Sequence, residues 1–525
     1  GEKPAVLKGS ESIPAIEDIL DSAGVELLPK IRADLQDLRE VTEQTIMALK
    51  QANDKKPYLF LRGGPVRIEP DDHGEMIARE LTADRLRHEL ARVAQWYKVG
   101  RNGEEVDAKP PLDVVRDVLA SPRLPFPVLS SIVRAPTFGP DGSLQLEPGY
   151  HPASKTYYVP TGDVPDVPEQ PTVLDVARAK QLVLEELLGD FPFAGDADRA
   201  HAVALFLLPF VRSMINGPTP LHLVEASSQG SGKGLLADVA LRPALGHAVG
   251  IIPPPKDDEE LRKSITARLC EGRAAVVLDN VYSLTSAVLA AALTAEMWDD
   301  RVLGKNETVS LPVRWVWVAT GNNATVSTDI ARRSIRIRLV PAQDKPWLRT
   351  DFRHPNLREW VNENRGELIW AALTMVKSWI VAGMPGPQVA PLGSFESWSQ
   401  VIGGILEHIG IDGFLANIEE FYEIADTEGA IWRQFVAAWW DEYENRPVKA
   451  GDLLKIAQEI DLFDLKGSTE KAQTTALGKA LRRQKDRIFG EFRIELAGSY
   501  KKQFLWRLNR VASARTEEPH NKEPF

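Results

Sequence analysis

The sequence contains one cysteine, Cys270, among its 525 residues. A lone thiol excludes an internal disulfide and favours a reducing, cytoplasmic setting. Long hydrophobic runs are also lacking, because no apolar stretch reaches the roughly 20 residues that a membrane-spanning helix needs. The best candidate, residues 202–211, lies between His201 and Arg212, which predicts a buried helix. We therefore expect a protein without a membrane partner.

Metal-site and polymerase patterns are lacking as well. The nine histidines are scattered, without the spacing of a metal site. The acid-rich run EPDDHGE, residues 69–75, follows a strand-like segment and is better explained as a turn. Residues 1–170 show no convincing primase or polymerase active site. The composition, 43% hydrophobic and 26% charged, is that of ordinary folded domains.

The chain length predicts roughly three domains of about 150 residues each. We expect residues 1–170 to form a separate unit, with a Pro-rich linker over 159–172. The elements predicted within it are a polar helix over 13–51, a hairpin around the Gly-Gly pair in 57–69, and an amphipathic helix over 82–99 that opens at Thr82.

Near residue 173 the pattern changes, and helices begin to alternate with short, strongly apolar strands. Continuous Val, Leu and Trp runs between helices are typical of a parallel sheet that is buried on both faces. The predicted strands are LHLVEA (221–226), AAVVLDN (274–280), VRWVWVAT (313–320) and SIRIRLV (334–340).

The stretch EASSQGSGKGLLADV, residues 225–239, is similar to a phosphate-binding loop of the form G-x-x-x-x-G-K-[ST]. It departs at two positions: Ser227 replaces the first Gly, and Gly234 lacks the hydroxyl that would touch Mg²⁺. Its order of strand, loop and helix is the context that the motif requires, and a Gly-rich turn is the alternative. The residues expected to bind nucleotide are Gly230, Ser231, Gly232, Lys233, Gly234 and Leu235, with Lys233 reaching the β- and γ-phosphates.

Two further predicted strands end in polar residues. Asp279 follows an apolar run and can hold Mg²⁺ through water. Asn280 comes next; it can orient a water but cannot accept its proton. Asn322 and Asn323 end the following strand, and an amide there can orient water against a γ-phosphate. Taken alone, each is simply a strand end.

Two arginines, Arg332 and Arg333, precede the last predicted strand. Either can act as an arginine finger that donates charge to ATP bound by a neighbouring subunit, and a solvated face is the alternative. Within that strand, apolar residues alternate with Arg336 and Arg338, which predicts a half-buried strand.

The four motifs in this order, over residues 175–350, resemble the AAA+ core of superfamily 3-like helicases. The resemblance is closest to the primase-helicase C-terminal modules of phages, plasmids and integrated mobile elements. Gly234 and Asn280 depart from the family pattern, which affects expected turnover more than nucleotide binding. The roles that the resemblance implies are Walker A lysine for Lys233, Walker B acid for Asp279, sensor for Asn322, acid before the arginines for Asp329, and finger for Arg332 or Arg333.

The fold class implied is multidomain α/β. The expected domains are an α+β N-terminal domain (1–170) that serves as a collar, an origin-binding domain or a primase remnant, an AAA+ P-loop ATPase core (173–350), a helical lid or connector (351–428), a C-terminal winged-helix domain (429–512) and a flexible tail (513–525).

Two segments are expected to contact DNA, and the first is a predicted hairpin in which RVLG (301–304) pairs with TVSLPV (308–313). Superfamily 3 helicases carry a hairpin with a basic tip at this point in the chain, facing the central pore of a ring. Lys305 is therefore the candidate, supported by Arg301, because Lys follows phosphates without reading sequence. An ordinary surface hairpin is the alternative.

The second segment, residues 465–510, carries twelve Lys or Arg and four Asp or Glu, a net charge of +8 in a chain of −11. Helix (448–460), helix (468–488) and hairpin (492–508) form a winged-helix order. A solvated basic face, or a winged helix that contacts protein, is the alternative. The residues expected to contact DNA are Lys479, Arg482, Arg483, Lys485, Lys501 and Lys502.

These predictions lead to an ATP- and Mg²⁺-dependent DNA helicase or translocase of a phage or mobile element. We expect it to act in replication as a ring of six subunits, with single-stranded DNA in its pore and duplex DNA as a further ligand of the C-terminal domain. Two alternatives stay open. One is an AAA+ switch with a regulatory or defence role; the other is a replication initiator whose ATP site only organises the oligomer.

Overall fold

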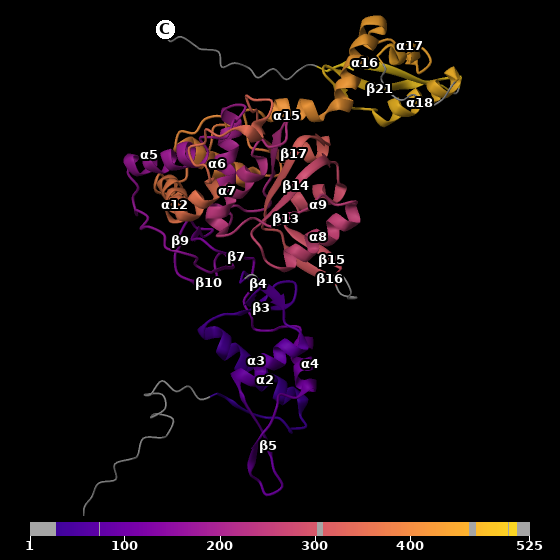
Figure 1. Cartoon of the computed structure of the whole chain (residues 1–525). Coiled ribbons are helices and arrows are strands. Elements are labelled where there is room, and N and C mark those ends of the chain that lie inside the picture. Colours follow the sequence, from indigo (N-terminus) through magenta and orange to yellow (C-terminus); the bar gives the residue numbers. More distant parts are fainter. Residues whose placement is uncertain (1–27, 73, 302–307, 461–468, 502, 512–525) are drawn as a thin grey trace, which may run out of the picture. The chain divides into compact units, whose positions relative to one another are not determined.

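The computed structural model describes residues 28–72, 74–301, 308–460, 469–501 and 503–511. The chain forms two compact units. The first comprises the chain up to residue 324 together with 333–416, and the second comprises 325–332 together with 417–525. Figure 1 labels the main elements of both units. The finer division into five domains stays a prediction.

The N-terminal part of the first unit combines small sheets with three helices that pack together. The predicted Gly-Gly hairpin is confirmed, because β2 (Leu59–Leu61) pairs antiparallel with β3 (Pro65–Pro70), and β4 (Met76–Glu80) extends this sheet. The remaining elements are β1 (Lys30–Arg32), α2 (Leu38–Lys55), α3 (Ala83–Val93), β5 (Gln95–Val99), β6 (Glu105–Asp107) and α4 (Leu112–Ala120).

The helix predicted over 82–99 is shorter than expected. Thr82 caps α3, and its side chain accepts a hydrogen bond from the backbone N–H of Arg85. The helix ends at Val93, because Ala94 is extended and the chain continues as β5, parallel to β1. In β5 the side chain of Trp96 is buried, and its indole N–H donates to the Leu90 carbonyl at 2.8 Å.

The polar helix predicted over 13–51 is also revised. Residues 13–27 lie outside the described residues, and Lys30–Arg32 is a strand. The helix α2 starts at Leu38, where the Asp37 carboxylate accepts from two backbone N–H groups of the first turn, and it continues to Lys55.

After α4 the chain forms short strands and then the Pro-rich segment 159–172, which contains neither helix nor strand, in keeping with the predicted linker. One sheet has the order β10-β11-β7, and β8 and β9 form a hairpin. Their bounds are β7 (Ser131–Val133), β8 (Thr137–Phe138), β9 (Leu144–Gln145), β10 (Gly149–His151) and β11 (Thr156–Tyr158).

Arg62 joins this N-terminal part to the rest of the first unit. Its guanidinium is buried and donates to the carbonyl of Leu269 at 2.6 and 2.9 Å, to that of Leu129 at 3.2 Å and to that of Ser130. Burial lowers the pKa of Arg62 to about 10. The three carbonyl groups therefore take the place of water as hydrogen-bond acceptors for the buried Arg62 guanidinium.

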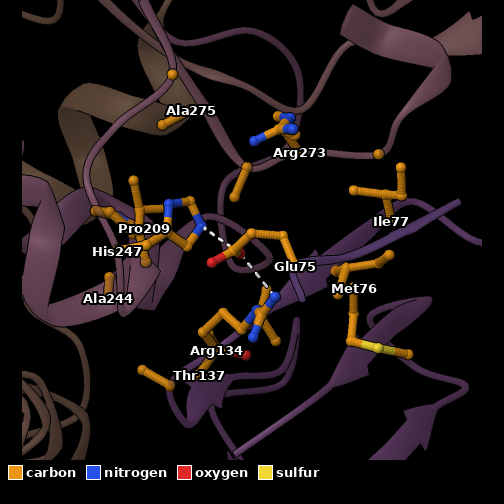
Figure 2. A pocket seen from close by; sticks show the side chains of 17 residues that line it. Glu75, Met76, Ile77, Arg134, Thr137, Pro209, Ala244, His247, Arg273 and Ala275 are labelled. Carbon is orange, nitrogen blue, oxygen red and sulfur yellow. Dashed lines mark hydrogen bonds and ion pairs between the residues drawn. The ribbon is translucent and has the colours of Figure 1, made fainter. Parts of the chain in front are cut away.

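A second junction lies in a small pocket between β4, β7 and the end of α7 (Lys233–Leu245). Figure 2 shows the Glu75 carboxylate between the Arg134 guanidinium, at 2.7 Å, and the His247 ring, at 3.1 Å. The acid run 69–75 begins inside β3, where Glu69 and Pro70 pair with β4, and its described residues 71, 72, 74 and 75 form the predicted connection between these strands. Its last residue makes the contacts above.

The central sheet of the first unit confirms a mixed α/β fold with parallel strands. Its order is β13-β14-β17-β12-β18, and β12 is parallel to both of its neighbours. The four predicted strands are confirmed as β12 (Leu221–Ala226), β14 (Ala275–Leu284), β17 (Val316–Val326) and β18 (Ser334–Leu339), joined by β13 (Ile251–Ile252). Every residue of β12 is buried, as expected for a strand covered on both faces.

Helices pack around this sheet. The predicted buried helix is confirmed as α6 (Asp196–Val211), which packs on α7 and β18, and no helix among the described residues is long and apolar enough to cross a membrane. Figure 1 shows α6 and α7 on one side of β14 and α8 and α9 on the other. Other elements of the unit are α5 (Val173–Gln181), a π-helix (Leu182–Leu187), α8 (Asp258–Cys270), α9 (Ala287–Thr294), a 3₁₀ turn (Pro346–Leu348), α11 (Leu357–Glu363), α12 (Arg365–Val381), α13 (Glu396–Trp398), a π-helix (Ser399–Gly403) and α14 (Gly404–His408).

The hairpin predicted over 301–313 forms, with a different first strand. β15 (Met297–Arg301) pairs antiparallel with β16 (Thr308–Pro312), and Arg301 faces Thr308 at the last described pair. The ladder therefore begins four residues earlier than predicted. Residues 302–307, including Lys305, lie outside the described residues.

The second unit packs around three aromatic residues of α16: Trp432, Phe435 and Trp439. The predicted C-terminal hairpin is confirmed as β21 (Phe492–Tyr500) and β22 (Gln503–Arg510), in a sheet of order β19-β22-β21-β20. Its other elements are α10 (Thr328–Ala331), α15 (Ile418–Ala425), α16 (Thr427–Tyr443), β19 (Val448–Lys449), α17 (Leu454–Glu459), α18 (Glu470–Arg483) and β20 (Ile488–Phe489).

Both predicted C-terminal helices are shortened. The helix expected over 448–460 is reduced to α17, because Val448–Lys449 pairs with β22 as a strand. The helix expected over 468–488 is α18, capped by Thr469, and it ends at Arg483 because Ile488–Phe489 joins the sheet.

Candidate nucleotide site

The phosphate-loop motif forms a tight turn between β12 and α7. Gly230 and Gly232 have φ of +71° and +88°, a conformation that strongly favours glycine. Gly232 is the N-cap of α7 and offers no side chain to the first-turn N–H groups. Those groups have no partner within the helix and carry its partial positive charge, so the turn suits an anion.

Lys233 begins α7, and its side chain points to the neighbouring strand. Its ammonium donates to the Asn322 side-chain oxygen at 2.6 Å and to the Ser228 carbonyl at 3.1 Å. Only 9% of the residue is exposed, and burial lowers the pKa of Lys233, an effect that the nearby Asp279 charge opposes. The structure thus brings together Lys233 and Asn322, which are 89 residues apart.

Asp279 lies on β14, two strands away from β12. Its carboxylate accepts a hydrogen bond from the Thr320 hydroxyl at 2.6 Å, and the same hydroxyl accepts from the backbone N–H of Asn280 at 2.8 Å. Because β17 lies between β14 and β12, Thr320 and Asn322 stand between the acid and the lysine. Sequence reasoning missed Thr320; it ends the apolar run of β17, which was the available signal.

Asn280 and Asn323 do not have the backbone conformation of ordinary strand ends. Both have positive φ, +53° and +47°, and both are exposed. β17 continues past Asn322 to Val326, so the strand does not end at the asparagine pair. The side-chain amide of Asn280 is 3.5 Å from the Tyr282 hydroxyl, a contact on the solvent side of β14.

Glu225 is a second residue that sequence reasoning missed. It is 9% exposed, and its carboxylate accepts from the backbone N–H of Ala324 at 3.1 Å. Burial raises the pKa of Glu225, against the opposing charges of Arg336 and Arg338 on the neighbouring strand. The acid at the start of EASSQGSGKG was visible in the sequence, but its neighbours were not.

The prediction of a half-buried β18 is wrong, because Arg336 is only 4% exposed. β18 lies at the edge of the sheet, but residues before α6 cover that edge. The Ala194 N–H donates to the Arg338 carbonyl, and the Asp198 carboxylate accepts from the Arg338 N–H at 2.7 Å. The covering segment and the neighbouring Glu225 therefore bury Arg336, which a half-buried strand would have left exposed.

A cavity of about 460 Å³ opens beside the phosphate loop. A methyl group at Gly230 would lie 3.0 Å from the Trp347 Cβ, and one at Gly232 would lie 3.3 Å from the Phe191 ring. The glycines thus allow aromatic residues to approach the loop. The remaining lining includes Leu235, Phe352 and His354. Concave, largely apolar cavities of this size suit organic ligands.

Gly234 stands apart from the other loop glycines. A methyl group there would meet nothing within 4 Å, and its φ is not positive. The site therefore has room for the hydroxyl that the motif usually carries. Without that hydroxyl, Asp279, joined to Thr320, is the charged oxygen ligand that the site offers to a metal ion.

The donors fit Mg²⁺ and a nucleoside triphosphate. Mg²⁺ is commonly held by one or two carboxylates, waters and substrate phosphates, a role open to Asp279. Among the described residues, no group of three or more His, Cys, Asp or Glu forms an all-protein metal site.

The two candidate finger arginines both lie just before β18, which begins at Ser334. Arg332 belongs to the second unit, where it forms an ion pair with Asp329 at 2.7 Å and is 63% exposed. It lines an open cleft with Tyr422, Asp426 and Arg433. Arg333 belongs to the first unit, where its carbonyl accepts from the Leu221 N–H.

The predicted DNA-contacting residues fall into two groups. Arg301 is an exposed residue at the end of β15 in the first unit. Lys305 and Lys502 lie outside the described residues. The second unit holds the others: Lys479, Arg482 and Arg483 on α18, Lys485 after it, and Lys501 at the hairpin turn.

No protein-family model and no curated protein matches the chain. Among solved structures, the C-terminal region of NrS-1 in an apo form is similar, with a TM-score of 0.34 and 12% identity, covering 85% of this chain and 96% of that one. JCV helicase with a bound thiazolopyridine compound has a TM-score of 0.22 and 15% identity, covering 51% of this chain and 65% of that one. At these scores the superpositions carry no argument, and the function is argued from the site.

Proposed function

We propose that the protein is an ATP- and Mg²⁺-dependent DNA helicase or translocase that acts in replication as a ring, with six subunits as the expected number. The observation that carries the proposal is the convergence of Lys233, Asn322 and the Asp279–Thr320 pair beside an anion-binding turn. These groups come from two neighbouring strands, β14 and β17, and from the first residue of α7.

Lys233 is expected to exchange partners when a triphosphate binds. Its buried ammonium donates to a backbone carbonyl and to an amide oxygen, which are neutral acceptors. Burial without a full counter-charge explains the lowered pKa. A phosphate oxygen would supply that charge, while Asn322 becomes able to orient a water molecule.

Bound Mg²⁺ would neutralise charge on the β- and γ-phosphates. Asp279 is the residue that would hold it, through water, and Thr320 fixes the direction of its carboxylate. The nucleoside would extend into the cavity beside Trp347 and Phe191. Closure of that cavity around a base would exclude water from the phosphates.

Motor activity requires coupling to a second subunit and to DNA. We propose that Arg332 or Arg333 acts on ATP held by an adjacent copy, which for Arg332 means release from Asp329. The Arg301–Lys305 hairpin would follow single-stranded DNA, and the basic segment 465–510 would hold DNA nearby, in a winged-helix manner.

The test is ATP hydrolysis and strand displacement on a forked duplex by the full chain. Lys233→Ala and Asp279→Asn should each lower the rate of ATP hydrolysis by about 100-fold or more and abolish strand displacement. Each substitution removes a group that would stabilise charge in the transition state. Asp166→Asn, which changes an exposed acid in the Pro-rich segment, is the matched control and should leave both rates within about twofold. Normal hydrolysis in Asp279→Asn would contradict the proposal.

Subunit mixing tests the shared site. Lys233→Ala and an Arg332→Ala, Arg333→Ala double variant should each be inactive alone. Mixed, they should recover part of the activity, because some interfaces then combine an intact loop with intact arginines. No recovery in mixed rings would argue against action between subunits.

A second candidate is a nucleotide-dependent switch that binds DNA without unwinding it. One observation favours it: the residue after Asp279 is Asn280, which has no carboxylate to take a proton from water and points to the solvent side. Slow hydrolysis with no strand displacement on the fork would select this candidate over the motor.

A further inference from the structure

The C-terminal hairpin extends beyond the core that it helps to build. Its inner face is buried at Ile494, Trp506 and Leu508, all within the aromatic cluster of α16. Past Trp506 the ladder continues for three more pairs, ending with Tyr500 opposite Gln503. These last pairs, residues 498–505, are called the tip below.

The tip carries two aromatic residues that the core does not need. Tyr500 is 54% exposed and Phe504 is 49% exposed, and neither belongs to the buried cluster. Phe504 pairs with Ser499 and alternates with Trp506, so it lies on the inner face. Tyr500 pairs with Gln503, one step along, and therefore lies on the outer face. The tip thus presents one ring on each side.

Each ring has a cation over it. The Arg482 guanidinium, from α18, is 5.8 Å from the Phe504 ring centre. On the other face, the ammonium groups of Lys449 and Lys501 are 5.6 and 5.4 Å from the Tyr500 ring centre. Ion pairs among the described residues 470–510 do not use these cations; they join Lys485 to Asp486, Arg507 to Glu495 and Arg510 to Glu491.

We propose that the tip binds unpaired bases of single-stranded DNA, with Tyr500 and Phe504 as stacking surfaces and Lys449, Lys501 and Arg482 as phosphate contacts. Rings beside unneutralised cations match the two parts of a nucleotide strand, since bases stack on aromatic faces and phosphates attract cations. A thin hairpin with a ring on each face fits the junction where a duplex opens.

This inference rests on the proposed action on DNA, and it deepens it. A winged helix that only reads a duplex groove would need the cations of α18 but not exposed rings at the hairpin tip. The proposal therefore predicts that the second unit prefers unpaired or forked DNA over blunt duplex. It is independent of ATP hydrolysis.

The experiment measures fluorescence anisotropy of labelled 20-mer oligothymidine, a blunt 20-base-pair duplex and a fork, with the full chain and no nucleotide. The double variant Tyr500→Leu, Phe504→Leu keeps apolar bulk but removes both rings. It should lose about tenfold or more in affinity for the single strand and the fork, and less than about twofold for the duplex. Ile488→Ala, an equally exposed apolar residue on β20, is the matched control and should change neither.

The cations supply a second measurement. Arg482→Gln should weaken binding to all three DNAs and reduce the dependence of affinity on salt by about one released counterion. Thermal unfolding of each variant checks that the unit still folds. Single-strand binding unchanged in the double variant would overturn the proposal, and so would equal loss on duplex and single strand.

The outcome is separable from that of the nucleotide site. A chain that hydrolyses ATP but binds no DNA at all overturns the tip and leaves the ATPase standing. A Lys233→Ala chain that no longer hydrolyses ATP should still bind oligothymidine with unchanged affinity in the absence of nucleotide.

Discussion

The candidate nucleotide site and the hairpin tip hold their proposed functional side chains in opposite ways. Lys233 and Asp279 are held by hydrogen bonds from neighbouring strands, in surroundings that change the pKa of the lysine. Tyr500 and Phe504 are half exposed and lie beside cations, and Phe504 also makes an edge-on ring contact with Trp506. A buried site has its geometry set by the fold, whereas an exposed one is available to a ligand that supplies the missing contacts.

The largest expected effect compares two aromatic residues on one strand. Trp506→Ala should lower the free energy of unfolding by about 3–5 kcal/mol, because it empties a site in the core of the second unit. Phe504→Ala, two residues away, should cost less than about 1 kcal/mol. Chemical denaturation measures both, and equal losses would show that the tip is part of the core.

The next effect concerns a histidine in the first unit. The ring of His201 contacts the Arg336 carbonyl through Nδ1 at 2.8 Å and accepts from the Leu415 N–H through Nε2 at 3.1 Å. This pair of contacts fits only the neutral ring with its proton on Nδ1. Burial lowers the pKa of His201 to about 4, from 6.5.

Because the folded pKa is the lower one, this contribution to stability is complete above pH about 6.5 and is lost as the pH falls toward 4. The loss should reach about 3 kcal/mol at pH 4. Unfolding free energy measured against pH should show a shallower slope in His201→Gln. An unchanged slope in that variant would exclude His201 as its source.

A smaller effect separates two glycines of one loop. Gly230→Ala should weaken nucleotide binding by about tenfold or more, since a Cβ meets Trp347 and a positive φ costs roughly 1–2 kcal/mol. Gly234→Ala should bind normally, because its Cβ meets open space. Titration calorimetry with ATP and Mg²⁺ measures both. Similar losses in the two variants would mean that the loop conformation differs when nucleotide is bound.

The smallest expected effect is an increase in the apparent affinity for Mg²⁺. Gly234→Ser restores the hydroxyl of the usual motif in a position with room for it. We expect the Mg²⁺ concentration for half-maximal hydrolysis to fall about two- to fivefold. Gly234→Ala controls for the higher helix propensity of residues other than glycine. An equal gain in the alanine variant would assign the change to the helix.

Much of the fold was predictable because it depends on local patterns. The strands 221–226 and 334–339 are short apolar runs between helices, and the Gly-Gly turn marks its hairpin. The strand 95–99 was missed because the amphipathic pattern of α3 continues through it, and pairing with β1 decides the outcome. The burial of Arg336 was missed because its neighbours come from distant segments.

The sequence indicated which residues belong to the candidate site, but not which of them contact one another. The motif spacing identified Lys233, Asp279 and Asn322. Their contacts depend on the strand order, which places β17 between the other two strands and which no local pattern contains. Thr320 and Trp347 enter the site only through that order and through the path of the chain after β18.

The guanidinium of Arg62 limits how the chain can be dissected. A truncation that removes residue 62 withdraws the donor on which three carbonyl groups, of Leu129, Ser130 and Leu269, depend. One of these lies at the end of α8, within the layer that supports the acid strand. A fragment that begins after the Pro-rich segment lacks Leu129 and Ser130 as well, and it leaves the Leu269 carbonyl without its donor. Failure of such a fragment to hydrolyse ATP would therefore not count against the proposed roles of Lys233 and Asp279.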